Sequence, residues 1–559
     1  MTYFSKTLAI LVGLFTSILL SSPILAQDSG VLATTKDSLR GSITAERAWW
    51  DVVFYDLNVT VQPEDSSITG YNNITYRVDK EPKRMQIDLQ DPLTIDQITQ
   101  NGQSLDYNRA KNSYAYMVDM PDNLKKDSLY TISVYYQGKP KVAENAPWDG
   151  GFVWKQDSLG NPFIATANQG LGASVWWPNK DHQSAEPDSM SINITVPSNI
   201  KNVSNGRLRD TTQHNNGMTT WSWFVSNPIN NYNIAVNAGN YVNFKDTYEG
   251  KNGKLDLSYW VLEHNLEKAK EQFQQVKPMM QCFEDWFGPY PFYADSFKLV
   301  ETPHLGMEHQ SAVAYGNEYQ NGYLGKDLSG SGWGLKWDFI IIHEAAHEWW
   351  GNSITTNDVA DMWVHEGFTS YSESIYTECQ FGKEAGAEYA RGMRDGIENK
   401  EPITGEYGLN NEGSGDMYNK AHNMLHMIRQ IVDNDSTWKN ILRGIQKEFR
   451  HQIVTADQIE RYIIEQSGED LDDVFDQYVH YADIPTFQYY IKNDVLFYRW
   501  KANVDHFDMP LKVTLTNGSY TFIYPSSDRW QRSELSLKNA GDFKIDKDFY
   551  VKTDSVSTR

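Results

Sequence analysis

Residues 339–347 read Phe-Ile-Ile-Ile-His-Glu-Ala-Ala-His, and residues 363–367 read Trp-Val-His-Glu-Gly. The apolar run that opens the first stretch predicts a helix buried in the protein interior. On a helix, positions i and i+4 lie on the same face, so His343 and His347 can direct their imidazoles at one metal ion. Glu344 is offset by one residue and would lie beside that ion, where a carboxylate can act as a general base.

The second stretch supplies a third metal ligand. Eighteen residues separate His347 from Glu366, which lets the chain return as a second helix. Three protein ligands leave the fourth tetrahedral position open to water, as a catalytic zinc site requires. We therefore expect His343, His347 and Glu366 to hold one zinc ion per chain and to support hydrolysis. The alternative is a solvated helix face that matches the motif by chance.

The N-terminus has the composition of a secretory signal. Residues 1–26 carry one charge, Lys6, followed by an uncharged run and Ile24-Leu25-Ala26, which predicts cleavage after Ala26. A retained N-terminal anchor is the alternative. No later segment is apolar for long enough to span a bilayer. We therefore expect a secreted or periplasmic protein that is soluble once processed, with no membrane contact beyond the signal peptide.

The composition narrows the classes of partner. The 559 residues carry a formal charge of −23, which becomes −24 when Lys6 is removed with the signal. This charge argues against a nucleic acid or an anionic membrane as partner. The two cysteines, Cys282 and Cys379, allow at most one disulfide, so large hydrophobic cores must stabilise the fold. The sequence carries no signal for a particular oligomeric state.

Three patterns follow one another along the chain. Apolar and polar residues alternate from about residue 50 to 244, helical periodicity extends from about 266 to 478 with a kink expected at Pro278, and short alternating segments return after Pro485. These patterns predict a multidomain α+β fold. Its expected parts are a polar linker at 27–47, an N-terminal β domain at 48–248, a mostly helical catalytic domain at 249–482 and a small C-terminal β domain at 483–559.

A further motif precedes the metal helix. Leu305-Gly306-Met307-Glu308-His309 lies in a stretch typical of an exposed strand. Together with the metal motifs, it resembles the aminopeptidase N family of gluzincin zinc metallopeptidases, whose pattern here is Gly-x-Met-Glu-Asn. The resemblance implies that Glu308, beside Gly306 and Met307, binds the free α-amino group of a substrate. Such a carboxylate would limit cleavage to the first residue. A solvated Glu on a strand is the alternative.

Two more stretches resemble this family. Tyr418-Asn419-Lys420-Ala421 is similar to Tyr-x-Lys-Gly, whose Tyr donates a hydrogen bond to the oxyanion, so the resemblance assigns that role to Tyr418. A Tyr that only packs in the core is the alternative. The stretch from Gln169 to Asp181 is also similar to the family, which implies that Gln169 reaches into the cleft.

The resemblance also implies supporting residues and an architecture. Glu373 lies seven residues after Glu366 on the same helix face, where it can orient a metal-bound histidine, or it is simply a surface residue. The family implies a saddle-like N-terminal β domain, a thermolysin-like catalytic domain and a small C-terminal β-sandwich. The sequence departs from the family pattern near working residues, at Leu305, His309, His365 and Ala421.

We interpret the sequence as that of a zinc aminopeptidase that acts on peptides with a free N-terminus. In it, Glu344 is the general base, Tyr418 stabilises the oxyanion and Glu308 anchors the amino group. An endopeptidase on the same catalytic domain is one alternative. A non-catalytic peptide-binding protein that retains the site as a scaffold is the other.

Overall fold

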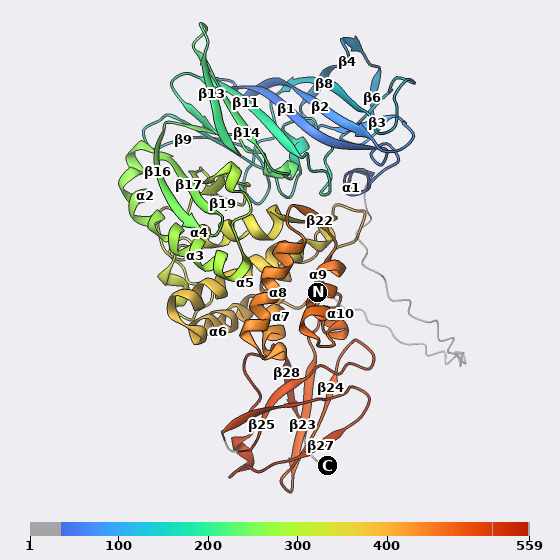
Figure 1. Ribbon diagram of the computed structural model, residues 1–559, viewed down its shortest axis with the longest axis vertical. Helices are drawn as coiled ribbons and strands as arrows, with labels where there is room; N and C mark the ends of the chain where they lie inside the picture. The colour runs from blue at the N-terminus through green and yellow to red at the C-terminus, as the bar shows by residue number, and fades with distance from the viewer. Residues whose placement is uncertain (1–34, 517, 557–559) are drawn as a thin grey trace, which may run out of the picture.

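A computed structural model describes residues 35–516 and 518–556. A β-rich N-terminal part, a helical middle part and a C-terminal β part follow one another along the long axis of the molecule (Figure 1). This confirms the expected multidomain α+β architecture. The expected signal peptide, residues 1–26, lies outside the described residues. Among the described residues, no helix is both long and apolar enough to cross a bilayer.

The N-terminal part is built on an eight-stranded sheet. In β11, Ser189–Pro197, buried and partly exposed residues alternate along the strand, which is the pattern of a sheet with one face on the core. This strand pairs in parallel with β1, Trp50–Gln62, in the middle of the sheet. The sheet order is β13 (Arg207–Gln213), β14 (Met218–Val225), β11, β1, β2 (Ser67–Val78), β8 (Leu129–Gly138), β4 (Thr94–Gln100) and β5 (Gln103–Ser104).

Two smaller sheets complete the N-terminal part. Trp176 and Trp177 are fully buried in the core that the sheets share. The four-stranded sheet has the order β12 (Lys201–Val203), β15 (Asn237–Gly239), β10 (Pro162–Ala167) and β9 (Gly151–Gln156), and the three-stranded sheet has the order β3 (Met85–Asp88), β7 (Ala115–Val118) and β6 (Tyr107–Arg109).

The segment before β1 differs from the expectation of a polar linker at 27–47. From residue 35 on it is packed on the protein, and it contains the helix α1, Thr35–Gly41. The Arg47 side chain is fully buried, and its guanidinium lies 2.6 Å from Asp88. A buried charge needs such a partner. The segment is therefore ordered by contacts such as that between Arg47 and Asp88, although its polar composition is typical of a free linker.

The middle part begins with a five-stranded sheet that carries the motif of Glu308 on its edge. Strand β16 crosses the boundary expected at 248/249, because it forms a hairpin with β17 inside this sheet. The short strand β19 pairs antiparallel with β20 at the opposite edge. The order is β16 (Tyr241–Gly250), β17 (Gly253–Leu262), β18 (Phe297–Glu301), β20 (Val313–Tyr315) and β19 (Gly306–Met307).

Helices pack against this sheet and against one another. The break in the first helical segment lies at a 3₁₀ turn, Phe273–Gln275, and not at Pro278 as expected. Pro278 is the third residue of α3, where backbone N–H groups lack helical partners and proline is tolerated. The helices are α2 (Leu266–Gln272), α3 (Val276–Phe287), α4 (Phe339–Ala346), α5 (Met362–Phe381), α6 (Lys383–Gly392), α7 (Asp416–Val432), α8 (Asp435–Glu448), α9 (Ala456–Ser467) and α10 (Asp472–Val479).

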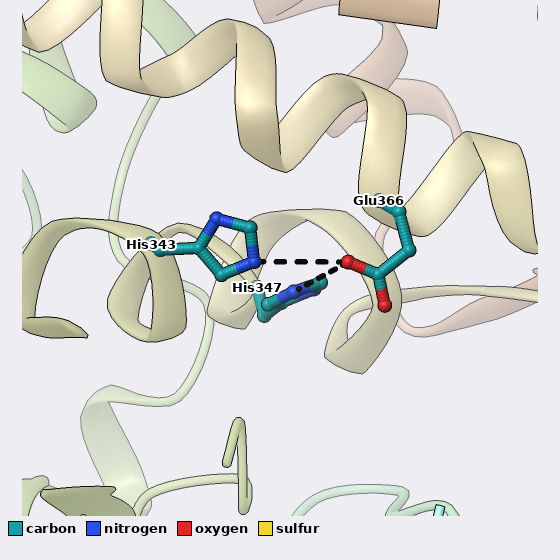
Figure 2. Close-up of side chains that lie close together, drawn as sticks. All are labelled: His343, His347 and Glu366. Carbon is teal, nitrogen blue, oxygen red and sulfur yellow. Dashed lines mark ion pairs between the residues drawn. The ribbon is translucent and has the colours of Figure 1, made fainter. Parts of the chain in front are cut away.

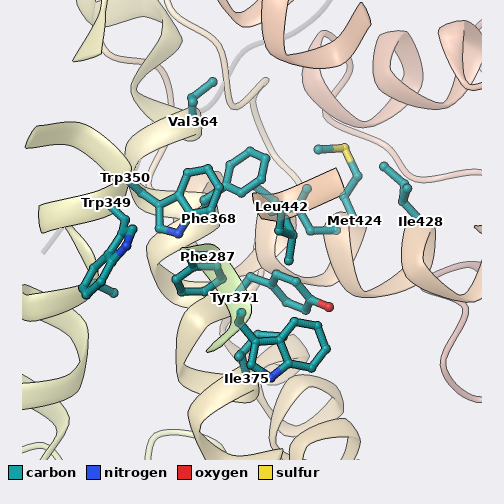
Figure 3. Close-up of a cluster of buried hydrophobic side chains, with 14 of the residues drawn as sticks. Phe287, Trp349, Trp350, Val364, Phe368, Tyr371, Ile375, Met424, Ile428 and Leu442 are labelled. Atoms are coloured by element: carbon teal, nitrogen blue, oxygen red, sulfur yellow. The ribbon is translucent and has the colours of Figure 1, made fainter. Parts of the chain in front are cut away.

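A dense hydrophobic core holds α5 in place. Phe368, Tyr371 and Ile375 project from this helix into a cluster of aromatic and aliphatic side chains that also includes Trp350 and Leu442 (Figure 3). A disulfide between Cys282 and Cys379 joins α3 to α5, which settles the pairing that the sequence left open. The helix that carries Glu366 is therefore fixed by packing and by a covalent link.

The C-terminal part consists of two small sheets. Phe487 and Trp500 are buried and extend the hydrophobic core of the middle part into this region. The dipeptide Asn517-Gly518 predicts a hairpin turn, but residue 517 lies outside the described residues. The larger sheet has the order β27 (Gln531–Glu534), β24 (Val495–Lys501), β23 (Thr486–Lys492) and β28 (Lys552–Ser555), and the smaller pairs β25 (Leu511–Thr516) with β26 (Ser519–Ile523).

Candidate metal centre and substrate cavity

Helix α4 directs two histidines to one point. Its N-terminus is capped by Asp338, whose carboxylate accepts hydrogen bonds from the backbone N–H groups of Ile340 and Ile341. This cap satisfies N–H groups that the first helical turn leaves free. His343 and His347 then lie one turn apart with ring centroids 5.1 Å from each other. The local sequence therefore fixes both the start of the helix and the direction of its imidazoles.

Glu366, on α5, faces both imidazoles (Figure 2). Its Oε2 atom lies 3.7 Å from Nε2 of His343 and 3.3 Å from Nε2 of His347. This oxygen is buried and receives no hydrogen bond from the described residues. A buried carboxylate oxygen that faces two imidazole nitrogens suits a cation between them. The three residues fit a metal ion of the zinc type.

The electrostatics of the two histidines agree with this fit. Burial lowers the pKa of His343, but the Glu366 and Glu373 carboxylates outweigh it and raise the pKa well above its usual value. Burial also lowers the pKa of His347, and Glu366 and Glu308 raise it above its usual value. The surrounding carboxylates thus favour positive charge at the point where the imidazoles meet.

Both histidines have a second partner that sets the ring orientation. Nδ1 of His343 lies 2.7 Å from Glu373 Oε1, and the other oxygen of Glu373 accepts a hydrogen bond from the hydroxyl of Tyr389 at 2.7 Å. Nδ1 of His347 lies 2.9 Å from the carbonyl oxygen of Trp350. With each Nδ1 bonded in this way, each Nε2 is the atom available to a metal. No sequence signal identified Tyr389 or the Trp350 carbonyl.

The motif of Glu308 is buried, not exposed as its strand pattern suggested. Glu308 follows β19, is 3% exposed, and accepts a hydrogen bond from the hydroxyl of Tyr232 at 2.9 Å. A carboxylate oxygen of Glu308, one of Glu344 and a ring nitrogen of His347 lie within 4.8 Å of one another. A Cβ atom at Gly306 would lie 2.8 Å from Oε1 of Glu344, so a larger residue at this position would displace the Glu344 carboxylate.

The remaining predicted residues meet in the same place. Burial raises the pKa of Glu344 to about 7. The Tyr418 ring, from α7, packs beside the His343 imidazole with centroids 6.2 Å apart, and burial raises the pKa of Tyr418 well above its usual value. The phenol is therefore a neutral donor. The side-chain amide of Gln169 donates to Oε1 of Glu366 at 3.2 Å, so Gln169 reaches the cluster from the N-terminal part.

The departures from the family pattern point away from the cluster or pack beside it. His309 is fully buried, and burial lowers its pKa to about 3. Nε2 of His365 accepts a hydrogen bond from the backbone N–H of Thr356 at 2.9 Å, and His365 does not line the cavity. Ala421 packs against Gly367, where a Cβ atom would approach its methyl group to 2.4 Å. Leu305 lines the cavity.

All the predicted site residues border one cavity of about 470 Å³. This volume is typical of a small-ligand site. Apolar side chains, among them Tyr323, Leu328 and Phe339, form much of its wall. Glu412, which precedes α7, also lines it and was missed in the sequence, because nothing in the surrounding Gly- and Asn-rich segment marks one acidic residue as functional. The predicted residues in the cavity are Gln169, Gly306, Met307, Glu308, His343, Glu344, His347, Glu366, Glu373 and Tyr418.

Curated relatives share part of this chain. Glutamyl aminopeptidase of Rattus norvegicus is 21% identical over 343 residues, which cover 58% of this chain and 34% of that protein. Leucine aminopeptidase 2 of Vanderwaltozyma polyspora is 22% identical over 326 residues, 57% of this chain and 46% of that protein. Aminopeptidase B of Rattus norvegicus is 23% identical over 321 residues, which cover 54% of this chain and 46% of that protein. The matched region thus spans less than half of each relative.

Solved structures share the fold over a larger part. An M1 zinc metallopeptidase from Deinococcus radiodurans superposes with a TM-score of 0.64 at 20% identity, over 78% of this chain and 94% of that one. A variant of an M1 zinc metallopeptidase from the same organism, bound to a Tyr-Ser-Ala substrate, gives a TM-score of 0.66 at 19% identity. The superposition covers 78% of this chain and 96% of that one.

Family models cover more than half of the chain. Residues 53–232 match the peptidase M1 N-terminal domain, and residues 271–478 match the peptidase family M1 domain. The second match contains both metal motifs, the motif of Glu308 and Tyr418. The chain belongs to the M1 peptidases, in the aminopeptidase N-like family.

Proposed function

We propose that this protein is a zinc aminopeptidase that removes single residues from the N-termini of peptides. The observation that carries the proposal is the position of Glu308. Its carboxylate is buried at the edge of the same cavity as the His343, His347 and Glu366 cluster, and within 4.8 Å of both Glu344 and His347. A substrate ammonium bound there can place only the first peptide bond beside the cluster.

We further propose that His343, His347 and Glu366 hold the zinc ion. The buried Oε2 of Glu366 and the two Nε2 atoms support this set, and the relatives described as zinc metallopeptidases share the fold. Glu308 and Glu344, although close to His347, are better suited to other roles, because Glu308 already accepts the Tyr232 hydrogen bond. Bound zinc would supply a Lewis acid that activates water and polarises the scissile carbonyl.

In this proposal Glu344 moves the proton. It takes a proton from the attacking water and delivers it to the nitrogen of the leaving amine, so that the peptide bond breaks without releasing an unstable amide anion. Burial of Glu344 supports the role, because it brings the pKa to about 7, near the range in which a carboxylate can both accept and donate a proton.

Tyr418 and Glu373 support this chemistry in different ways. The neutral hydroxyl of Tyr418 donates a hydrogen bond to the carbonyl oxygen as that oxygen becomes negative. Glu373 holds the imidazole of His343 in the orientation that presents Nε2. Gln169 fixes the carboxylate of Glu366 from the N-terminal part. Secretion or export to the periplasm is proposed from residues 1–26 alone.

A panel of aminoacyl chromogenic substrates, assayed with and without a chelator, tests this function. We expect hydrolysis of substrates with a free α-amino group, loss of that hydrolysis with 1,10-phenanthroline and recovery on addition of zinc. Activity that the chelator leaves unchanged would contradict the metal assignment. Failure to hydrolyse any free aminoacyl substrate, in a protein that holds zinc, would contradict the aminopeptidase proposal.

A further inference from the structure

Five carboxylates line the cavity, and four of them already have a task. Glu308, Glu344, Glu366 and Glu373 are each at most 9% exposed. In the proposed function Glu308 binds the substrate ammonium, Glu366 is a zinc ligand and Glu344 is the general base. Both oxygens of Glu373 accept hydrogen bonds. The fifth carboxylate, Glu412, remains without a counterpart.

Glu412 differs from the other four in its environment. It is exposed to the cavity, and no other described residue makes a hydrogen bond or an ion pair with its side chain. Arg40 is the nearby cation, but its guanidinium donates to the carbonyl oxygen of Gly170 at 2.9 Å and lies 3.8 Å from Asp181. Among the described residues, no Lys or Arg lines the cavity. The negative charge of Glu412 is therefore available to a ligand.

Glu412 lies on the side of the cavity where the N-terminal part borders it, close to Arg40 and on the same wall as Gly170. The end of α1 packs on the segment that leads to it, since a Cβ atom on Gly41 would approach the backbone of Leu409 to 2.1 Å. Arg40, next to Gly41, bonds Gly170, the neighbour of Gln169. Arg40 and Gln169 also border a small cavity together with Tyr232, the partner of Glu308. These contacts place Glu412 on the side of the cavity that the N-terminal part closes through Gln169 and Gly170.

We propose that Glu412 is a specificity residue that binds the cationic side chain of an N-terminal Arg or Lys. The inference rests on the proposed aminopeptidase function and names its substrate class. Much of the wall of the same cavity is apolar, and such a surface can pack against the methylene stem of these side chains. The carboxylate then pairs with the charged end, while Glu308 holds the α-amino group. An N-terminal Asp or Glu is disfavoured by repulsion.

The test compares arginine with citrulline, its uncharged analogue of nearly the same shape, as aminoacyl fluorogenic substrates. We expect the wild type to have a higher kcat/KM for arginine by at least about tenfold, the effect of a charge-assisted hydrogen bond. Glu412→Gln should remove most of this ratio and leave leucine and citrulline substrates within a few-fold of wild type. Glu406→Gln, an exposed residue of the same segment outside the cavity, is the matched control and should keep the ratio.

A binding measurement separates recognition from turnover. Titration calorimetry with L-arginine and L-citrulline on the zinc-loaded protein should show the same preference and the same loss in Glu412→Gln. Two results would overturn the inference: an arginine-to-citrulline ratio of kcat/KM near one in the wild type, or a ratio that Glu412→Gln leaves unchanged. In either case, turnover of the leucine substrate would leave the proposed aminopeptidase function intact. Absence of turnover with every free aminoacyl substrate would instead reject the proposed function.

Discussion

Two pairs of buried histidines lie close to the same motifs and have opposite environments. His343 and His347 face the cavity, and each ring has an acceptor at Nδ1 and the Glu366 carboxylate near Nε2. His309 and His365 adjoin Glu308 and Glu366 in sequence but lie in the interior. Neither ring nitrogen of His309 has a partner among the described residues, and burial lowers the pKa of both His309 and His365 to about 3.

In the proposed function, the partners of a histidine, and not its place in a motif, decide whether it holds the metal. The cavity pair is surrounded by carboxylates that favour a positive charge. The interior pair is neutral and serves packing or a backbone hydrogen bond, as His365 does with Thr356. His309, which directly follows Glu308 in the sequence, therefore belongs to the interior pair.

The largest effect should come from replacing Glu366, the carboxylate that both cavity histidines face. Glu366→Ala removes the carboxylate that faces both Nε2 atoms, so we expect zinc binding to weaken sharply and activity to be abolished. His309→Asn, which alters the interior histidine, is the control and should retain zinc and activity. Elemental analysis of the purified variants checks both. One zinc per chain at full activity in Glu366→Ala would show that the wrong carboxylate was assigned.

Glu344→Gln separates metal binding from proton transfer within the cavity. The amide should leave the zinc content unchanged, because Glu344 is not among the proposed ligands. Turnover should fall by about two to four orders of magnitude, the range for a positioned general base. Steady-state kinetics at matched zinc occupancy measure the change. If turnover stayed close to wild type, another group would have to move the proton.

Tyr418→Phe tests the smaller contribution of the oxyanion donor. Loss of one such hydrogen bond should lower kcat by about a hundredfold to a thousandfold with little change in substrate binding, because the bond strengthens only as the transition state forms. A kcat and KM comparison with wild type measures it. A kcat within a few-fold of wild type would return Tyr418 to a role in packing beside His343.

Much of the architecture and of the metal cluster follows from local sequence patterns. Period-two alternation marks strands such as β11, and the i, i+4 spacing of His343 and His347 depends only on helical geometry. The short motif around Glu366 also predicts a helix, α5, on which this third residue lies. Such signals are short-range, so a sequence displays them directly. The motif of Glu308 could be assigned only through its resemblance to a family, because a single carboxylate on a short strand has no periodic signal.

The features that were missed depend on contacts distant in sequence. The Arg47 side chain can be buried because Asp88 lies opposite it. Composition alone does not show this pairing, so the polar segment around Arg47 had the composition of a linker. Strand β16 belongs to the catalytic sheet through its pairing with β17, although its alternation continues that of the N-terminal part. Tyr232, the partner of Glu308, is 76 residues away from it. No local pattern encodes these pairings.

The most direct test of the central claim compares one peptide with a free and with an acetylated N-terminus. We expect the wild type to trim the free peptide from its N-terminus and to leave the acetylated peptide intact, because acetylation removes the ammonium that pairs with Glu308. Glu308→Ala should lower kcat/KM for the free peptide by at least about tenfold, the loss of a charge-assisted contact. Equal cleavage of the two peptides by the wild type would contradict the aminopeptidase assignment and leave only the zinc site standing.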